Sequence, residues 1–114
     1  MLTLAALQQY GAAVDEGLQR CMGNEAFYLR LVGLVPQDAS FAALADRLAA
    51  GDLAGGFAAA HALKGIAANL ALTPLLTPVS EITEHLRAGE EMDYAPLLAQ
   101  IEQQKQQLAA LAQA

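Results

Sequence analysis

The chain has 114 residues, is 55% hydrophobic and carries a net charge of −6. This length suits one domain, residues 1–114, and the negative charge argues against nucleic acid as a partner. No apolar run approaches the ~20 residues that cross a membrane, and no signal-peptide pattern opens the chain. Cys21 has no second cysteine to pair with, so we expect a cytoplasmic protein. We also expect the protein to be a monomer.

The first third of the chain predicts two helices. The first covers about 3–22, with Gly11 and Gly17 as candidate breaks. The second covers about 25–35, and Pro36 ends it because proline disfavours a helical residue before it. The inward-facing side chains of this second helix are expected to be Phe27, Leu31 and Leu34.

Four more helices are predicted in the rest of the chain. They cover about 38–48, 53–72, 73–87 and 93–111. Pro78 lies inside the third of them, so that helix is expected either to kink there or to begin at Thr77. Gly89 follows it as a typical C-terminal cap. The expected fold class is therefore all-α: an up-and-down four-helix bundle with a short additional N-terminal helix.

His61 stands in the helix expected over 53–72. The buried stripe of this helix is predicted to consist of Ala59, Leu63, Ile66 and Leu70. At about 100° per residue, His61 lies nearly opposite that stripe and should reach solvent. Because a neutral imidazole is a nucleophile near pH 7, an exposed histidine of this kind can accept a phosphoryl group.

Lys64 and Gly65 follow His61 by three and four residues and share its face of the helix. The Lys64 ammonium can reach a phosphoryl group on His61 as a mobile point charge. Gly65 leaves no side chain beside the imidazole, so a partner can approach closely. A glycine costs a helix about 1 kcal/mol relative to alanine, so its presence here calls for such a reason.

This part of the chain resembles the H-x-x-K-G signature of histidine-containing phosphotransfer (HPt) domains, in the stretch His61-Ala62-Leu63-Lys64-Gly65. The resemblance extends over about residues 10–112. It implies a helical bundle without kinase activity that exchanges a phosphoryl group on His61 with aspartates of receiver domains. Such receivers belong to response regulators or hybrid sensor kinases. They would supply Mg²⁺, so the resemblance implies no cofactor for the chain itself.

The sequence departs from the family pattern at three positions. Ala71 stands where members usually have glycine, and Ile66 where they usually have a small or hydroxyl residue. Some members place a glutamine on the next helix to hydrogen-bond the imidazole. Thr83 falls near that position, so the resemblance does not imply this support here.

Three apolar residues flank the motif: Phe57, Ala58 and Ala68. They either form a docking patch for the receiver or lie partly buried against the N-terminal helix, since an exposed apolar patch is costly in solubility. A rival function is a helical adaptor that docks a receiver or a partner helix without phosphotransfer. A metal site built from His61 and His85 is opposed by the lack of further ligands at metal-binding spacing.

Overall fold

The computed structural model describes residues 1–113, and in them the chain is helical without any strand. The all-α prediction is therefore confirmed. The elements are α1 (Leu4–Tyr10), α2 (Val14–Arg20), α3 (Glu25–Leu34), the 3₁₀ turn η1 (Val35–Gln37), α4 (Ser40–Ala49), α5 (Leu53–Asn69), α6 (Thr73–Arg87) and α7 (Ala95–Gln113). The chain is thus divided more finely than four long helices and one short N-terminal helix.

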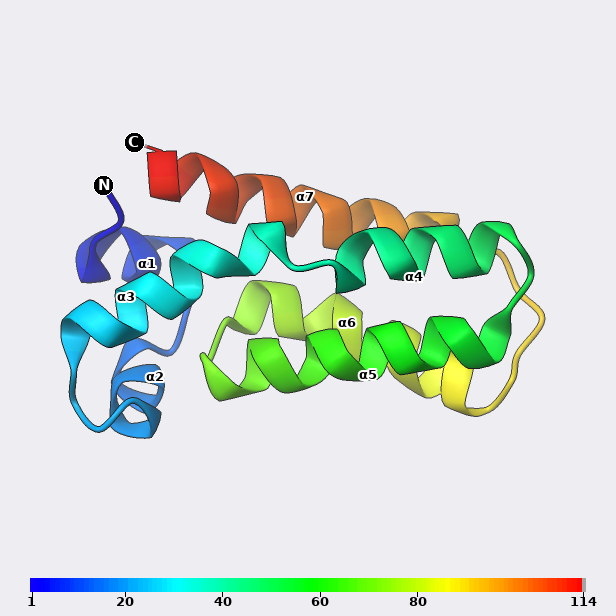
Figure 1. Ribbon diagram of the computed structural model, residues 1–114, viewed down its shortest axis with the longest axis horizontal. Helices are drawn as coiled ribbons and strands as arrows, with labels where there is room; N and C mark the ends of the chain where they lie inside the picture. The colour runs from blue at the N-terminus through cyan, green and yellow to red at the C-terminus, as the bar shows by residue number, and fades with distance from the viewer. Residues whose placement is uncertain (114) are drawn as a thin grey trace.

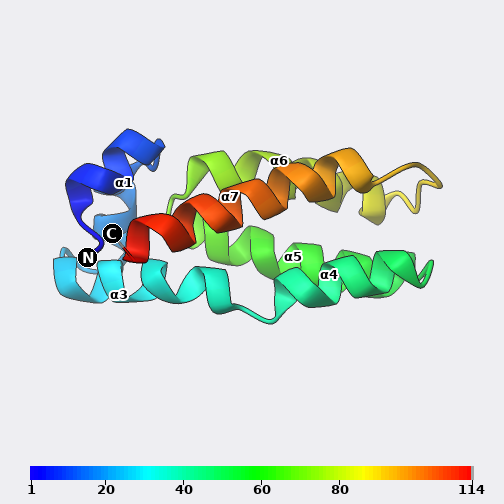
Figure 2. The same cartoon turned by 90° about the horizontal axis from the view of Figure 1, so that it is seen from above.

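The helices from α4 to α7 lie lengthwise beside one another, and successive helices run in opposite directions (Figure 1). α5 packs between α4 and α6, while α7 packs on α6 and also on η1 and α3. α3, η1 and α4 follow one another along one edge of the molecule, as Figure 2 shows from above. The N-terminus and the last turn of α7 lie at the end formed by α1, α2 and α3. The result is an elongated bundle with extents of 41 × 25 × 20 Å.

The N-terminal segment breaks at one of its two predicted positions. Gly11 ends α1 with a φ of 111°, a left-handed conformation that favours glycine. Gly17, by contrast, lies buried inside α2. A Cβ atom on Gly17 would stand 2.4 Å from Cε1 of Tyr28, so this glycine makes room for an aromatic ring. The predicted break at Gly17 was wrong, because α2 continues through this glycine. The glycine is needed for the contact of α2 with Tyr28 on α3.

The predicted inward face of α3 was wrong at two of its three residues, whereas Leu31 is half-buried against the core. Phe27 and Leu34 are 48% and 51% exposed, and the buried side chains are Tyr28 and Val32. The Tyr28 hydroxyl donates a hydrogen bond to the Leu70 carbonyl at 2.9 Å. The Tyr28 ring also packs against Gly17 of α2. These two contacts orient α3 so that Tyr28 and Val32 face the core.

α5 and α6 follow the prediction with two differences. Ile66 was expected in the core of α5 but is only half-buried, because the buried residues of this helix are centred on small side chains. They are Gly56, Ala59, Ala60, Leu63 and Ala67. α5 ends at Asn69 instead of near residue 72. α6 begins at Thr73 and continues through Pro78, so it does not start at Thr77.

Candidate functional site

His61 is the ninth of the 17 residues of α5 and is exposed. Its neighbours Ala60 and Leu63 are fully buried, so the helix presents His61 on the side that α4 and α6 leave uncovered. The exposure predicted from its position opposite Leu63 is thus confirmed. Asp52 starts the helix by accepting a hydrogen bond from the Gly55 N–H at 2.9 Å, which satisfies one of the free donors of the first turn. The imidazole therefore stands at the centre of a packed and capped helix.

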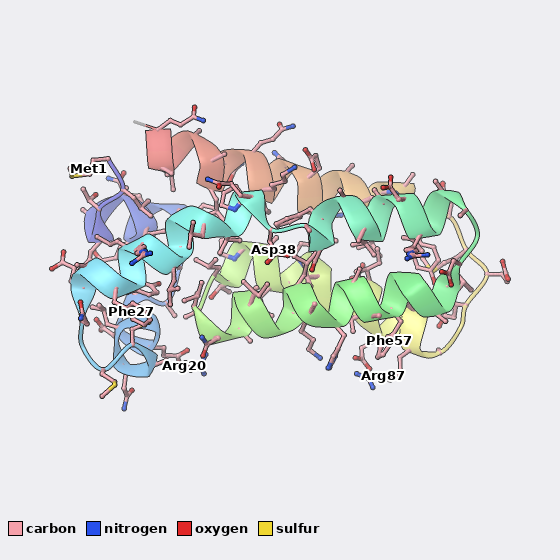
Figure 3. All side chains as sticks on the ribbon, in the orientation of Figure 1. Met1, Arg20, Phe27, Asp38, Phe57 and Arg87 are labelled. Carbon is pink, nitrogen blue, oxygen red and sulfur yellow. The ribbon has the colours of Figure 1, made fainter. Side chains whose placement is uncertain are left out.

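The His61 ring stacks on an aromatic neighbour one turn earlier. The ring centroids of Phe57 and His61 are 5.6 Å apart, and their planes differ by 19°. Arg87, from the end of α6, places its guanidinium carbon 5.0 Å from the centre of the Phe57 ring. Figure 3 shows Phe57 and Arg87 projecting from the same side of the α5–α6 pair. The imidazole is thus part of a stack that includes side chains from two helices.

Lys64 lies one turn after His61 and forms an ion pair with α6. Its Nζ is 3.6 Å from Oε2 of Glu84, and the Nε of Arg87 is 3.3 Å from Oε1 of the same carboxylate. The side chains of Lys64 and Glu84 are 36% and 57% exposed. Because exposed pairs of this kind contribute only about 0–1 kcal/mol, the lysine can readily turn to another anion.

Gly65 faces open space. A Cβ atom built on it would meet no atom within 4 Å, whereas one on Gly56 would lie 2.8 Å from Cδ2 of Leu48. Gly56 is therefore required by helix packing, and no contact within the described residues requires Gly65. The open space leaves room for an approaching partner at Gly65, and that role stays a prediction.

The three flanking residues have different surroundings. Phe57 is half-buried beneath Arg87, and Ala58 is exposed beside a hollow that α4 and α5 form together. The Ala68 carbonyl accepts a hydrogen bond from the guanidinium of Arg20, which comes from α2. Figure 3 places Arg20 at this end of the bundle. Contact with the N-terminal helices thus involves Ala68, and a docking role for the three residues stays a prediction.

Thr83 is fully buried and donates its hydroxyl to the Val79 carbonyl at 2.6 Å. Within residues 1–113, no hydrogen bond joins the His61 ring to another group. The sequence shows that no glutamine stands here, but Glu84 and Arg87 were not predicted to lie beside the site. Their spacing of three residues on one helix could have predicted the pair between them. Their contact with α5 is a tertiary contact that the spacing does not predict.

The His85 side chain forms no hydrogen bond or ion pair with the residues described above around His61. Its Nδ1 is 3.0 Å from Oε2 of Glu90, within the turn that follows α6. In residues 1–113, no three histidine, cysteine or acidic side chains gather closely enough to hold a metal ion. None of the described helices is both long enough and apolar enough to cross a lipid bilayer.

Comparison with protein families identifies one match. The family model described as "Hpt domain" matches residues 37–114, a segment that contains His61, Lys64 and Gly65 together with Glu84 and Arg87. α1, α2 and α3 precede the matched segment. Neither the curated proteins nor the solved structures gave a significant match.

Proposed function

Because the chain belongs to the histidine-containing phosphotransfer (Hpt) domain family, we propose that it carries a phosphoryl group on His61 between aspartates of receiver domains in a two-component phosphorelay. The observation that carries this proposal is the exposed imidazole in the middle of α5. It has an ammonium group one turn away and a glycine facing open space on the same side. We also infer that α3, η1 and α4 together form the first arm of an up-and-down four-helix bundle, completed by α5, α6 and α7.

The proposed reaction forms one bond and breaks one. The lone pair of an unprotonated ring nitrogen of His61 attacks the phosphorus of the receiver's aspartyl phosphate. A nitrogen–phosphorus bond forms as the bond from phosphorus to the carboxylate oxygen breaks, and the aspartate leaves as a carboxylate. The ring, now cationic, then releases the N–H proton of its other nitrogen to solvent. The reverse sequence passes the phosphoryl group to the next receiver.

The residues around His61 have supporting roles in this proposal. Lys64 steadies the phosphoryl oxygens, and Gly65 lets the receiver approach. The receiver supplies Mg²⁺ and most of the charge stabilisation that phosphoryl transfer requires. Phe57, Ala58 and Ala68 would contact the docked receiver. The chain would then be a phosphoryl carrier without kinase activity of its own. It would work as a cytoplasmic monomer.

The test is transfer of labelled phosphoryl groups from a panel of phosphorylated receiver domains of response regulators and hybrid kinases. We expect an acid-labile label on the wild-type protein and none on His61→Gln. His85→Gln is the matched control, because it removes the other histidine of the chain and should be labelled like the wild type. A receiver that binds wild type and His61→Gln equally while labelling neither would instead support the non-catalytic adaptor.

A further inference from the structure

The Glu84 carboxylate lies between two cations at the His61 site. Lys64 on α5 approaches Oε2 to 3.6 Å, and Arg87 approaches Oε1 to 3.3 Å from one turn along α6. The side chains of Lys64, Glu84 and Arg87 are 36%, 57% and 52% exposed, so none is locked in the core. One carboxylate thus holds both the lysine that would contact a phosphoryl group and the arginine that covers Phe57.

We propose that Glu84 is the resting-state counter-ion of Lys64 and competes with the phosphoryl group on His61 for this lysine. The inference rests on the proposed function of His61. In the unphosphorylated protein, Glu84 pairs with Lys64 and Arg87. In the phosphorylated protein, Lys64 turns to the phosphoryl oxygens while Arg87 keeps the Glu84 side chain in place. No covalent bond changes in this exchange, because only the partner of the ammonium group changes.

The charges of the groups indicate the direction of the exchange. A phosphoryl group carries a charge of about −1.5 to −2 near pH 7, more than the single charge of Glu84. An exposed ion pair changes an equilibrium constant by at most about fivefold, so the pair with Glu84 breaks easily. Because the pair with Glu84 must break before Lys64 can turn, part of the attraction between Lys64 and the phosphoryl group is lost. Glu84 therefore weakens the hold of His61 on the phosphoryl group, which suits a carrier that must also donate.

Glu84 also acts on the imidazole through Arg87. Its carboxylate anchors the guanidinium whose central carbon lies 5.0 Å from the centre of the Phe57 ring. Phe57 in turn stacks on His61 at a centroid distance of 5.6 Å. Glu84 is thus a positioning residue, because it reaches the reacting ring through two intervening side chains.

The lifetime of the phosphohistidine tests this proposal without a receiver. Phosphoramidate phosphorylates histidines chemically, and His61→Gln identifies which ³¹P signal belongs to His61. We expect Glu84→Gln to lengthen the lifetime of that signal about two- to fivefold. It should shift phosphoryl exchange with a receiver toward the carrier by a similar factor. Both effects should shrink as salt is added, because the charges are exposed.

Two comparisons separate this competition from a general effect of charge or folding. Glu102→Gln removes the same charge and an exposed pair with Lys105 on α7, so its phosphohistidine should decay like that of the wild type. In a Lys64→Ala background, Glu84→Gln should lengthen the lifetime less than it does in the wild-type background, because the competition requires Lys64. Glu84→Ala should act in the same direction as Glu84→Gln, and circular dichroism checks that each variant remains folded.

Several results would overturn the proposal. Equal lifetimes for Glu84→Gln and Glu102→Gln would show that the carboxylate does not compete for Lys64. An undiminished effect of Glu84→Gln without Lys64 would show that it acts by another route. A His61 that phosphoramidate cannot modify would remove the premise. If no receiver phosphorylates His61, the proposed function fails, while the lifetimes of the chemically phosphorylated variants still decide the role of Glu84.

Discussion

The His61 ring is supported by stacking on Phe57, and no hydrogen bond of the described residues reaches it. Thr83 on α6 is buried and donates its hydroxyl to the Val79 carbonyl. Aromatic pairs contribute about 0.5–1.5 kcal/mol beyond burial of their surface. This is enough to bias the orientation of an exposed ring while leaving both of its nitrogens available.

Phe57→Ala should slow phosphoryl transfer to His61 about threefold to tenfold, which corresponds to about 1 kcal/mol of lost orientation. Single-turnover transfer at increasing receiver concentration measures this effect. If Phe57 positions the ring, its loss lowers the limiting rate. If Phe57 binds the receiver, its loss raises the receiver concentration needed for half of that rate. An unchanged limiting rate would contradict the stacking argument and favour the docking role of Phe57.

Gly65→Ala should stabilise the protein by up to about 1 kcal/mol and slow transfer, because alanine favours a helix but adds a methyl group where the receiver approaches. Gly65→Glu should slow transfer further by bulk and by repulsion from the acidic site of the receiver. Urea unfolding and single-turnover transfer measure the two effects separately.

Gly33→Ala is the matched control for Gly65. Gly33 lies within α3, and a Cβ atom on it would also meet nothing within 4 Å. This variant should therefore gain similar stability and keep the wild-type transfer rate. Equal transfer rates for the alanine variants at both glycines would contradict the claim that the receiver passes close to Gly65.

For the helices, the sequence predicted those features that depend on residues close together in the chain. The bounds of α5 and the exposure of His61 follow from apolar period and capping, so they were found within a few residues. The rotation of α3 depends on a hydrogen bond between Tyr28 and Leu70, 42 residues apart. The role of Gly17 depends on the same tyrosine ring. Local patterns do not encode such tertiary contacts.

The pairing of Glu84 with Lys64 could not be predicted for the same reason. Sequence reasoning placed Lys64 one turn from His61, but the salt bridge requires the alignment of α5 with α6. That alignment depends on how the helices pack, in which small residues of α5 such as Ala60 and Ala67 are fully buried. The exposure of His61 was thus predictable, and the charged residues of α6 beside it were not.

Tyr28→Phe should destabilise the protein by about 1–2 kcal/mol, because it leaves the Leu70 carbonyl without the buried donor that lies 2.9 Å away. The variant should transfer phosphoryl groups at the wild-type rate, since Leu70 follows the end of α5 and lies two turns beyond His61. Urea unfolding together with transfer kinetics checks both statements. An unchanged unfolding midpoint would show that Tyr28 does not join α3 to α5 energetically.

At the scale of the whole molecule, one hydrophobic core connects the helices, and tyrosines enter it from different parts of the chain. Burial raises the pKa of Tyr10 and, aided by the nearby Cys21, the pKa of Tyr28. The pKa of Tyr94 is raised by burial and by the charges of Glu90 and Glu91. In each case the folded state favours the protonated phenol.

Stability should therefore fall in alkaline solution. Because the folded-state pKa values are raised, this contribution is fully present below the ordinary tyrosine pKa of about 10 and is lost as the pH rises through the folded values. Urea midpoints between pH 8 and 12, recorded with tyrosinate absorbance, measure the effect (a range of about two units on either side of 10). Tyrosines that ionise near pH 10 while the helix signal and the midpoint stay constant would contradict this expectation.

The central claim is that His61 accepts and returns a phosphoryl group. The most direct measurement is NMR of the two histidine rings, in which long-range ¹H–¹⁵N spectra separate His61 from His85. On addition of a phosphorylated receiver with Mg²⁺, we expect a ring nitrogen of His61 to shift and to couple to phosphorus while His85 stays unchanged. Excess unphosphorylated receiver should then restore the original His61 signals. Modification of His85 in place of His61, or an unaltered His61 ring with every receiver tested, would contradict the proposed role of His61.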